Sequence, residues 1–217
     1  MRTLFDEQLS QLNADLIDMG TMIEYAIESS ASALISMDGA LANRIVRFDH
    51  EVDHKERDIE SLCLKLILHQ QPIAKDLRFI SAALKMITDM ERIGDQAADI
   101  AEIVTMMLND DPPRITDHFS EMARVTTRMV RQSIDAFVSR DMLLARQVIH
   151  TDDVVDGLFD DVRGELIDLL ARNPDRGRQA LDLLMIAKYF ERIGDHATNI
   201  AEWVEFAITG IHKEENA

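Results

Sequence analysis

The chain has few of the residues that make turns. Its 217 residues include only 8 glycines, 4 prolines and 5% aromatic residues, against 47% apolar residues. A β-sandwich or β-barrel needs a turn roughly every ten residues, which this supply cannot provide. The composition therefore excludes an all-β fold and favours long helices. The single cysteine, Cys63, excludes a disulfide framework, and we expect it to be a buried free thiol.

Basic residues and long apolar runs are also scarce. The chain has 23 lysines and arginines against 40 aspartates and glutamates, a net charge of −17. This charge repels nucleic-acid phosphates and anionic membrane surfaces, so we expect no direct nucleic-acid partner and at most peripheral contact with a membrane. No run reaches the ~18 apolar residues of a membrane span, and the first residues lack a signal-peptide pattern. A cytoplasmic location is therefore expected, with metal cations and basic protein surfaces as natural partners.

Prolines and short breaks divide the chain into helical segments. The prolines lie at Pro72, at Pro112–Pro113 and at Pro174, and helical periodicity runs between them. Softer breaks lie at Asp38–Gly39 and at Arg140–Asp141. The sequence predicts six long helices, over residues 4–36, 38–69, 74–109, 116–138, 141–172 and 176–209.

An internal repeat shows how these helices are grouped. Residues 91–104 (ERIGDQAADIAEIV) align with residues 191–204 (ERIGDHATNIAEWV) at an offset of 100, and 10 of the 14 positions are identical. Upstream the offset becomes 103, with the change at Pro72 and Pro174, where a loop absorbs it. Each repeat holds three helices. We therefore predict an all-α fold of two tandem antiparallel three-helix bundles, with domains over residues 1–111 and 112–217.

Each copy of the repeated motif carries acidic residues one helical turn apart. In the first copy Glu91, Asp95 and Asp99 lie along one narrow stripe of the helix. The second copy repeats this stripe with Glu191, Asp195 and Asn199. An isolated acidic pair of this kind usually lies in solvent, beside the apolar face of its helix.

A second acidic pair lies on the preceding helix and faces the bundle. Asp49 lies close to the centre of its apolar face, and Asp53 lies at the edge of that face. Partly buried like charges cost several kcal/mol unless something neutralises them. Protonation through raised pKa values, a nearby arginine such as Arg92 or Arg78, and a bound multivalent cation all remain open as the compensation.

The duplication favours the bound cation. Both acidic pairs are kept in both halves, the later one as Asp152 and Asp156, while most surface residues differ. This second pair lies further from its apolar centre, and Arg163 is available as a salt-bridge partner, so a weaker second site is expected. Carboxylates suit hard cations, whereas structural zinc usually takes cysteine or histidine. The expected cofactor is a divalent or trivalent metal ion, with iron, manganese, magnesium and zinc left open.

Other motifs count against catalysis. A ferritin-like di-iron site needs two Glu-x-x-His motifs, and only Glu51-x-x-His54 has this spacing. His196 is matched by Gln96 in the first copy and is interpreted as a surface histidine. Gly94 and Gly194 interrupt strong helical patterns between the same acids, which indicates close helix approach or room for a cation. The sequence offers no catalytic nucleophile, so no enzymatic activity is expected.

Three stretches together resemble the PhoU family. They are the duplicated ERIGDxAxxIAE signature, the QPIAKDLR stretch of residues 71–78, and the TNIAEWVE stretch of residues 198–205. The resemblance covers essentially the whole chain. It implies two three-helix bundles with multinuclear metal clusters, and a cytoplasmic regulator that represses phosphate uptake and the phosphate-starvation regulon. The implied partners are a phosphate-specific ABC transporter, through its ATPase subunit, and a membrane sensor histidine kinase, and a homodimer is expected.

The resemblance also implies individual roles. It places metal ligands at Asp49, Asp53, Glu91, Asp95, Asp152, Asp156, Glu191 and Asp195, with Asp99 and Asn199 as secondary candidates. In the second half, residues 173–178 depart from the family pattern. Lys75, Asp76 and Arg78 are therefore candidates for partner contact in the first half only, with helix capping and an exposed ion pair as the alternative. A carboxylate-bridged metalloenzyme or metal-storage bundle, and a scaffold whose acids bind nothing, are the competing interpretations.

Overall fold

The computed structural model describes residues 2–70, 72–108, 113 and 115–211. Within them lie six long helices and one 3-10 turn, η1 (Pro174–Arg176), and no strand. The predicted all-α fold is confirmed, and the helix ends that the structure describes differ from the predicted ones by no more than two residues. The long helices are α1 (Arg2–Ser36), α2 (Gly39–Gln70), α3 (Ala74–Met107), α4 (Asp117–Ser139), α5 (Met142–Arg172) and α6 (Gly177–Thr209). The predicted domain boundary, between residues 111 and 112, lies outside the described residues.

The turns that start the second helix of each half have the same construction. One Asp38 carboxylate oxygen accepts hydrogen bonds from the backbone N–H groups of residues 40 and 41, at 2.9 and 3.0 Å. Asp141 does the same for residues 143 and 144, at 2.9 and 3.1 Å. The residues just before these aspartates, Met37 and Arg140, have left-handed φ angles of 51° and 56°. The two soft breaks in the sequence are therefore N-capped helix starts after a left-handed residue.

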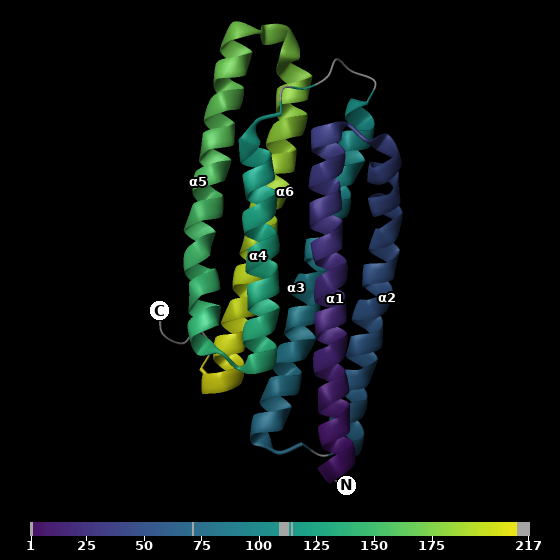
Figure 1. Cartoon of the computed structure of the whole chain (residues 1–217). Coiled ribbons are helices and arrows are strands. Elements are labelled where there is room, and N and C mark those ends of the chain that lie inside the picture. The colour runs from purple at the N-terminus through teal and green to yellow at the C-terminus, as the bar shows by residue number, and fades with distance from the viewer. Residues whose placement is uncertain (1, 71, 109–112, 114, 212–217) are drawn as a thin grey trace.

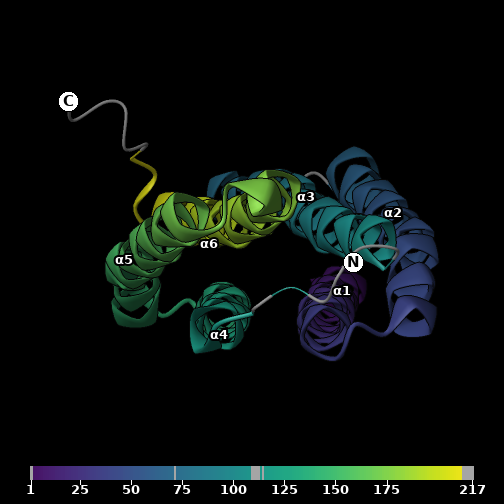
Figure 2. The same cartoon turned by 90° about the horizontal axis from the view of Figure 1, so that it is seen from above.

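The six helices form two layers. Seen from above, α2, α3, α6 and α5 form one curved row, and α1 and α4 lie side by side against it (Figure 2). Neighbours in chain order run antiparallel along the length of the bundle (Figure 1). The most extensive contact between any two described helices joins α3 to α6, so the third helix of each half forms the seam between the halves.

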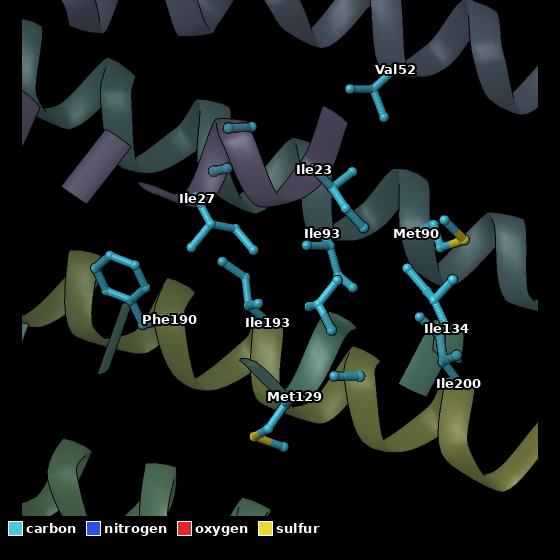
Figure 3. Close-up of a cluster of buried hydrophobic side chains, with 14 of the residues drawn as sticks. Ile23, Ile27, Val52, Met90, Ile93, Met129, Ile134, Phe190, Ile193 and Ile200 are labelled. Carbon is cyan, nitrogen blue, oxygen red and sulfur yellow. The ribbon is translucent and has the colours of Figure 1, made fainter. Parts of the chain in front are cut away.

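One apolar core runs through both halves. Ile93 and Ile193, from the two copies of the repeated motif, are fully buried at this seam. Ile23 and Ile27 of α1 and Met129 of α4 contribute to the same cluster (Figure 3). Cys63 is buried in this core as a free thiol, as expected. The two bundles therefore do not have separate interiors.

No described helix contains an apolar stretch that would cross a lipid bilayer.

Candidate metal centres

Three carboxylates of the first half converge between α2 and α3. Asp49, Asp53 and Asp95 each offer an oxygen, and these oxygens all lie within 4.8 Å of one another. All three side chains are half-buried. Asp49 and Asp53 come from successive turns of α2, and Asp95 comes from the facing turn of α3. Oxygens at this separation are close enough to bind one hard cation, which takes oxygen ligands at about 2.0–2.6 Å.

The electrostatics of this cluster are unfavourable without a cation. Burial, followed by the charges of Asp95 and Asp53, raises the pKa of Asp49 to about 6. One Asp49 carboxylate oxygen is buried and accepts no hydrogen bond from the described residues. Burial and the charge of Asp95 also raise the pKa of Glu91, which lies beside the cluster. A buried acceptor without a donor is costly, and a bound cation would satisfy it.

Gly94 allows the two helices to come this close. A Cβ atom at this position would lie 3.0 Å from Cγ1 of the buried Val52 and 3.6 Å from the Asp49 oxygen Oδ1. At Gly194 a Cβ atom would lie 3.1 Å from the Asp152 oxygen Oδ1 and 3.4 Å from Val155 Cγ1. Both glycines therefore serve close helix approach next to the acidic residues, as their sequence positions indicate.

The second cluster has the same layout but is more open. Burial, followed by the charges of Asp195 and Asp156, raises the pKa of Asp152 to about 6, as for its equivalent Asp49. Asp156 and Asp195 are exposed, whereas their equivalents in the first half are half-buried. Within the described part of the chain, only the first half brings three carboxylates within 4.8 Å.

A lysine side chain lies in the second cluster. Lys188 Nζ is 2.5 Å from a Glu191 carboxylate oxygen. Burial and the charge of Glu191 raise the pKa values of Asp156 and Asp195, and the charge of Lys188 offsets part of this increase. The equivalent residue in the first half is Thr88. The prediction that Arg163 would pair with this cluster is wrong, because Arg163 pairs with Asp160 at 2.9 Å, one turn away.

The two secondary candidates point across the seam. Asp99 lies beside Tyr189 of α6: burial raises the pKa of Asp99, and the Tyr189 hydroxyl lowers it in part. Asn199 donates its amide N–H to Asp89 of α3 at 3.0 Å. Tyr189 and Asp89 occupy equivalent positions in the two repeats. The secondary candidate of each half therefore lies against the equivalent position of the other half. These two residues connect the halves, and their role as ligands stays a prediction.

His196 is not the surface residue expected from sequence. Its Nδ1 lies 2.9 Å from the same Asp89 carboxylate, and its side chain is 22% exposed. The repeat could not reveal this contact, because Asp89 is matched by a tyrosine and His196 by a glutamine. Contacts between the halves depend on how α3 packs against α6, which the spacing within one helix does not specify.

Of the two arginines considered for the first cluster, only one lies there. Arg92 is 3.1 Å from Asp95 and 3.6 Å from Glu91, but its side chain is 56% exposed, so water screens its charge. Arg78 lies about 25 Å away along α3, near its first turn. Glu51 and His54 are both exposed, so their single Glu-x-x-His motif does not contribute to the buried cluster.

The first cluster opens into a cleft that both halves line. The cleft has a volume of about 600 Å³. Asp49, Asp95 and Asp99 line it from the first half, and Arg192 and His196 line it from the second. A ligand at the first cluster would therefore lie next to side chains of both repeats.

The fold and the clusters define the class of this protein: a duplicated helical bundle with an acidic cluster between the second and third helices of each half. The model of the PhoU domain family matches residues 16–104 and 119–204. The chain belongs to the PhoU family.

Named relatives match over nearly the full length. The chain is 35% identical over 210 residues to a protein of Clostridium acetobutylicum, covering 96% of each chain, and 38% identical over 206 residues to one of Zymomonas mobilis, covering 95% and 87%. Both are named phosphate-specific transport system accessory protein PhoU homolog. The crystal structure of PhoU from Pseudomonas aeruginosa superimposes with a TM-score of 0.89 at 31% identity, covering 95% of this chain and all of that one. A phosphate transport system regulatory protein PhoU from Streptococcus pneumoniae gives 0.87 at 25% identity, covering 95% and 98%.

Proposed function

We propose that this chain is a metal-binding, non-enzymatic regulator of phosphate homeostasis. It acts in the cytoplasm as a homodimer and represses phosphate uptake and the phosphate-starvation genes when phosphate is plentiful. Its partners are the ATPase subunit of a phosphate-specific ABC transporter and a sensor histidine kinase. Membership of the PhoU family and the names of the relatives, which describe accessory proteins of phosphate transport, support this assignment.

The observation that carries the metal-binding part is the first carboxylate cluster. Asp49, Asp53 and Asp95 would hold the ion, with Glu91 beside them. The donor set consists of oxygen atoms alone, which fits iron, manganese or magnesium better than zinc. When bound, the ion supplies positive charge that offsets the repulsion among these carboxylates and connects α2 to α3. The residues themselves orient the ligand oxygens and keep the site half-shielded from water.

The regulatory part is tested by deletion and complementation. A strain lacking the gene is complemented with the wild-type chain, with an Asp49→Asn/Asp95→Asn variant, or with Asp58→Asn as a matched control on the exposed side of α2. A phosphate-starvation reporter is measured in high phosphate. We expect the wild type and the control to restore repression and the double variant to lose it. Unchanged repression in the deletion strain would contradict the regulatory assignment, whatever the metal does.

The metal-binding part has its own test. Protein purified without added metal is analysed for bound elements, and its melting temperature is measured before and after treatment with a chelator. We expect bound metal in the wild type and in Asp58→Asn, with a lower melting temperature after chelation, and less bound metal and a smaller effect of the chelator in the double variant. If the wild type contains no metal and its melting temperature is unchanged by the chelator, the carboxylates bind no metal and are only part of the helical scaffold.

A further inference from the structure

We propose that a basic pocket at one end of the bundle, formed by Lys75, Arg78 and Arg140, binds a small tetrahedral oxyanion such as inorganic phosphate. The pocket lies where α3 begins and where α4 and α6 end, at the lower end of the bundle in Figure 1. Its volume is about 180 Å³, and the stacked rings of Phe79 and Phe137 and the last turns of α6 complete its wall. This size admits one small ion or a single side-chain group.

The three cations of this pocket have no acidic partner among the described residues. In this chain of net charge −17, several cations elsewhere are paired, as Arg131 is with Glu24 and Arg146 with Glu205. Lys75, Arg78 and Arg140 form no ion pair with any described residue. The Nε–H donor of Arg78 is buried and donates to no atom of the described residues. A buried charged donor without an acceptor is costly, which points to an anionic group as its partner.

The two guanidinium groups are held in place before any ligand arrives. The Arg140 guanidinium lies 4.9 Å from the centre of the Phe79 ring, and that ring stacks on Phe137 at 4.3 Å. The Arg78 guanidinium packs against Gly210, where any side chain would overlap it and where φ is +80°. Such fixed positions reduce the conformational entropy that binding must offset. Gly210 thus positions Arg78 through its lack of a side chain.

The chemistry of these groups suits an oxyanion. A guanidinium presents several N–H donors in one plane, which matches the oxygens of phosphate or sulfate, and an ammonium adds a point charge. The start of α3 at Ala74 adds partial positive charge, since no side chain caps its first backbone N–H groups. The negative field of the rest of the chain is screened over about 8 Å at physiological salt, so the pocket acts at short range.

The pocket takes residues from both halves, and the equivalent positions of the two repeats do not form a second one. Arg140 corresponds to Met37 at the same left-handed turn, and Lys75 corresponds to Asp175. Only Arg78 has a basic counterpart, Arg178. The pocket is also separate from the carboxylate cluster, because Arg78 precedes Asp95 by about 25 Å of helix. The proposal therefore goes beyond the metal-dependent function and stands without it.

Calorimetric titration of the full chain with inorganic phosphate at fixed ionic strength tests the proposal. The variants are Arg78→Gln and Arg140→Gln, and the matched control is Arg178→Gln. We expect binding by the wild type, at least about tenfold weaker binding in each pocket variant, and a change of less than about twofold in the control. The melting temperature of each variant is measured to show that it is folded. The NMR signal of the Arg78 Nε–H group is expected to shift during the titration.

Three results would overturn the proposal. The first is the absence of binding up to about 10 mM phosphate. The second is equal affinity in the wild type and Arg78→Gln, which would place phosphate elsewhere, for example on a metal at the carboxylate cluster. The third is Arg78-dependent binding to phosphatidylglycerol vesicles with no response to free phosphate, which would make the ligand a lipid headgroup.

Discussion

At the scale of single residues, the two carboxylate clusters differ in how their charge is offset. The first has no cation in its interior, since Arg92 reaches it from solvent. The second has the ammonium group of Lys188 on Glu191. An ion entering the second cluster has to displace this group or accept its repulsion, and both reduce affinity. The duplicated ligands are therefore not equivalent as binding sites.

Replacing Lys188 by the residue of the other half tests this difference. We expect Lys188→Thr to bind more metal per chain than the wild type, because Glu191 becomes free to act as a ligand. The measurement is the metal content per chain after loading and removal of free ions. Lys85→Thr, at an exposed lysine of α3, is the control and should leave the content unchanged. The same metal content in Lys188→Thr and the wild type would show that the lysine does not limit the second site.

At the scale of helices, the spacing between α2 and α3 depends on Gly94. A helix-interior glycine costs about 1 kcal/mol relative to alanine, so its presence here needs a compensating gain. The gain is the close approach of α3 to α2, since a Cβ atom at Gly94 would lie only 3.0 Å from the buried Val52. Val52 is fully buried and cannot move away without disturbing the core.

Alanine substitutions at different glycines should therefore have opposite effects. Overpacking costs about 1–3 kcal/mol, which exceeds the propensity gain, so Gly94→Ala should lower the free energy of unfolding. Gly164→Ala, on α5 with nothing within 4 Å of its Cβ position, should raise it by up to about 1 kcal/mol. Denaturant unfolding of the metal-free proteins measures both. Stabilisation by Gly94→Ala would mean that the helices are not closely apposed there.

The helices themselves were predictable, and the contacts between them only in part. Apolar periodicity and the position of Pro72 and Pro174 set the six helices, because these features act locally. The i,i+4 spacing of Asp49 and Asp53 places both on the bundle-facing side of their helix, and the resemblance to the PhoU family implied that Asp95 joins them. The positions of Lys188 and His196 did not follow, because a long side chain has several rotamers and tertiary packing selects among them.

At the scale of the whole molecule, the shared core predicts a single unfolding transition. The apolar faces of α3 and α6 bury each other at the seam, and neither half can shield its face alone. We expect calorimetry of the full chain to give one peak with equal calorimetric and van't Hoff enthalpies. A fragment of residues 1–111 should lack a cooperative transition. Two resolved peaks would show that the halves are independent domains.

The carboxylate clusters also make stability depend on pH. The folded-state pKa values of Asp49 and Asp152 are raised from 3.8 to about 6, so the folded state binds protons more tightly than the unfolded chain. Their favourable contribution is present below about pH 4 and is lost as the pH rises through about 6. A bound metal replaces these protons. The increase in melting temperature on adding metal should therefore be larger at about pH 7.5 than at about pH 5. An increase that is independent of pH would argue against these aspartates as ligands.

The seam between α3 and α6 resembles the interface of a symmetric dimer whose two subunits are covalently joined. In a homodimer each mutation appears twice, so both copies of a surface must change together. Fusion removes this restriction. One half of this chain carries Lys188 without a counterpart, and the turn of the same half carries Arg140 where the other has Met37. A fused pair can thus keep one framework and divide its tasks between two copies that are no longer obliged to match.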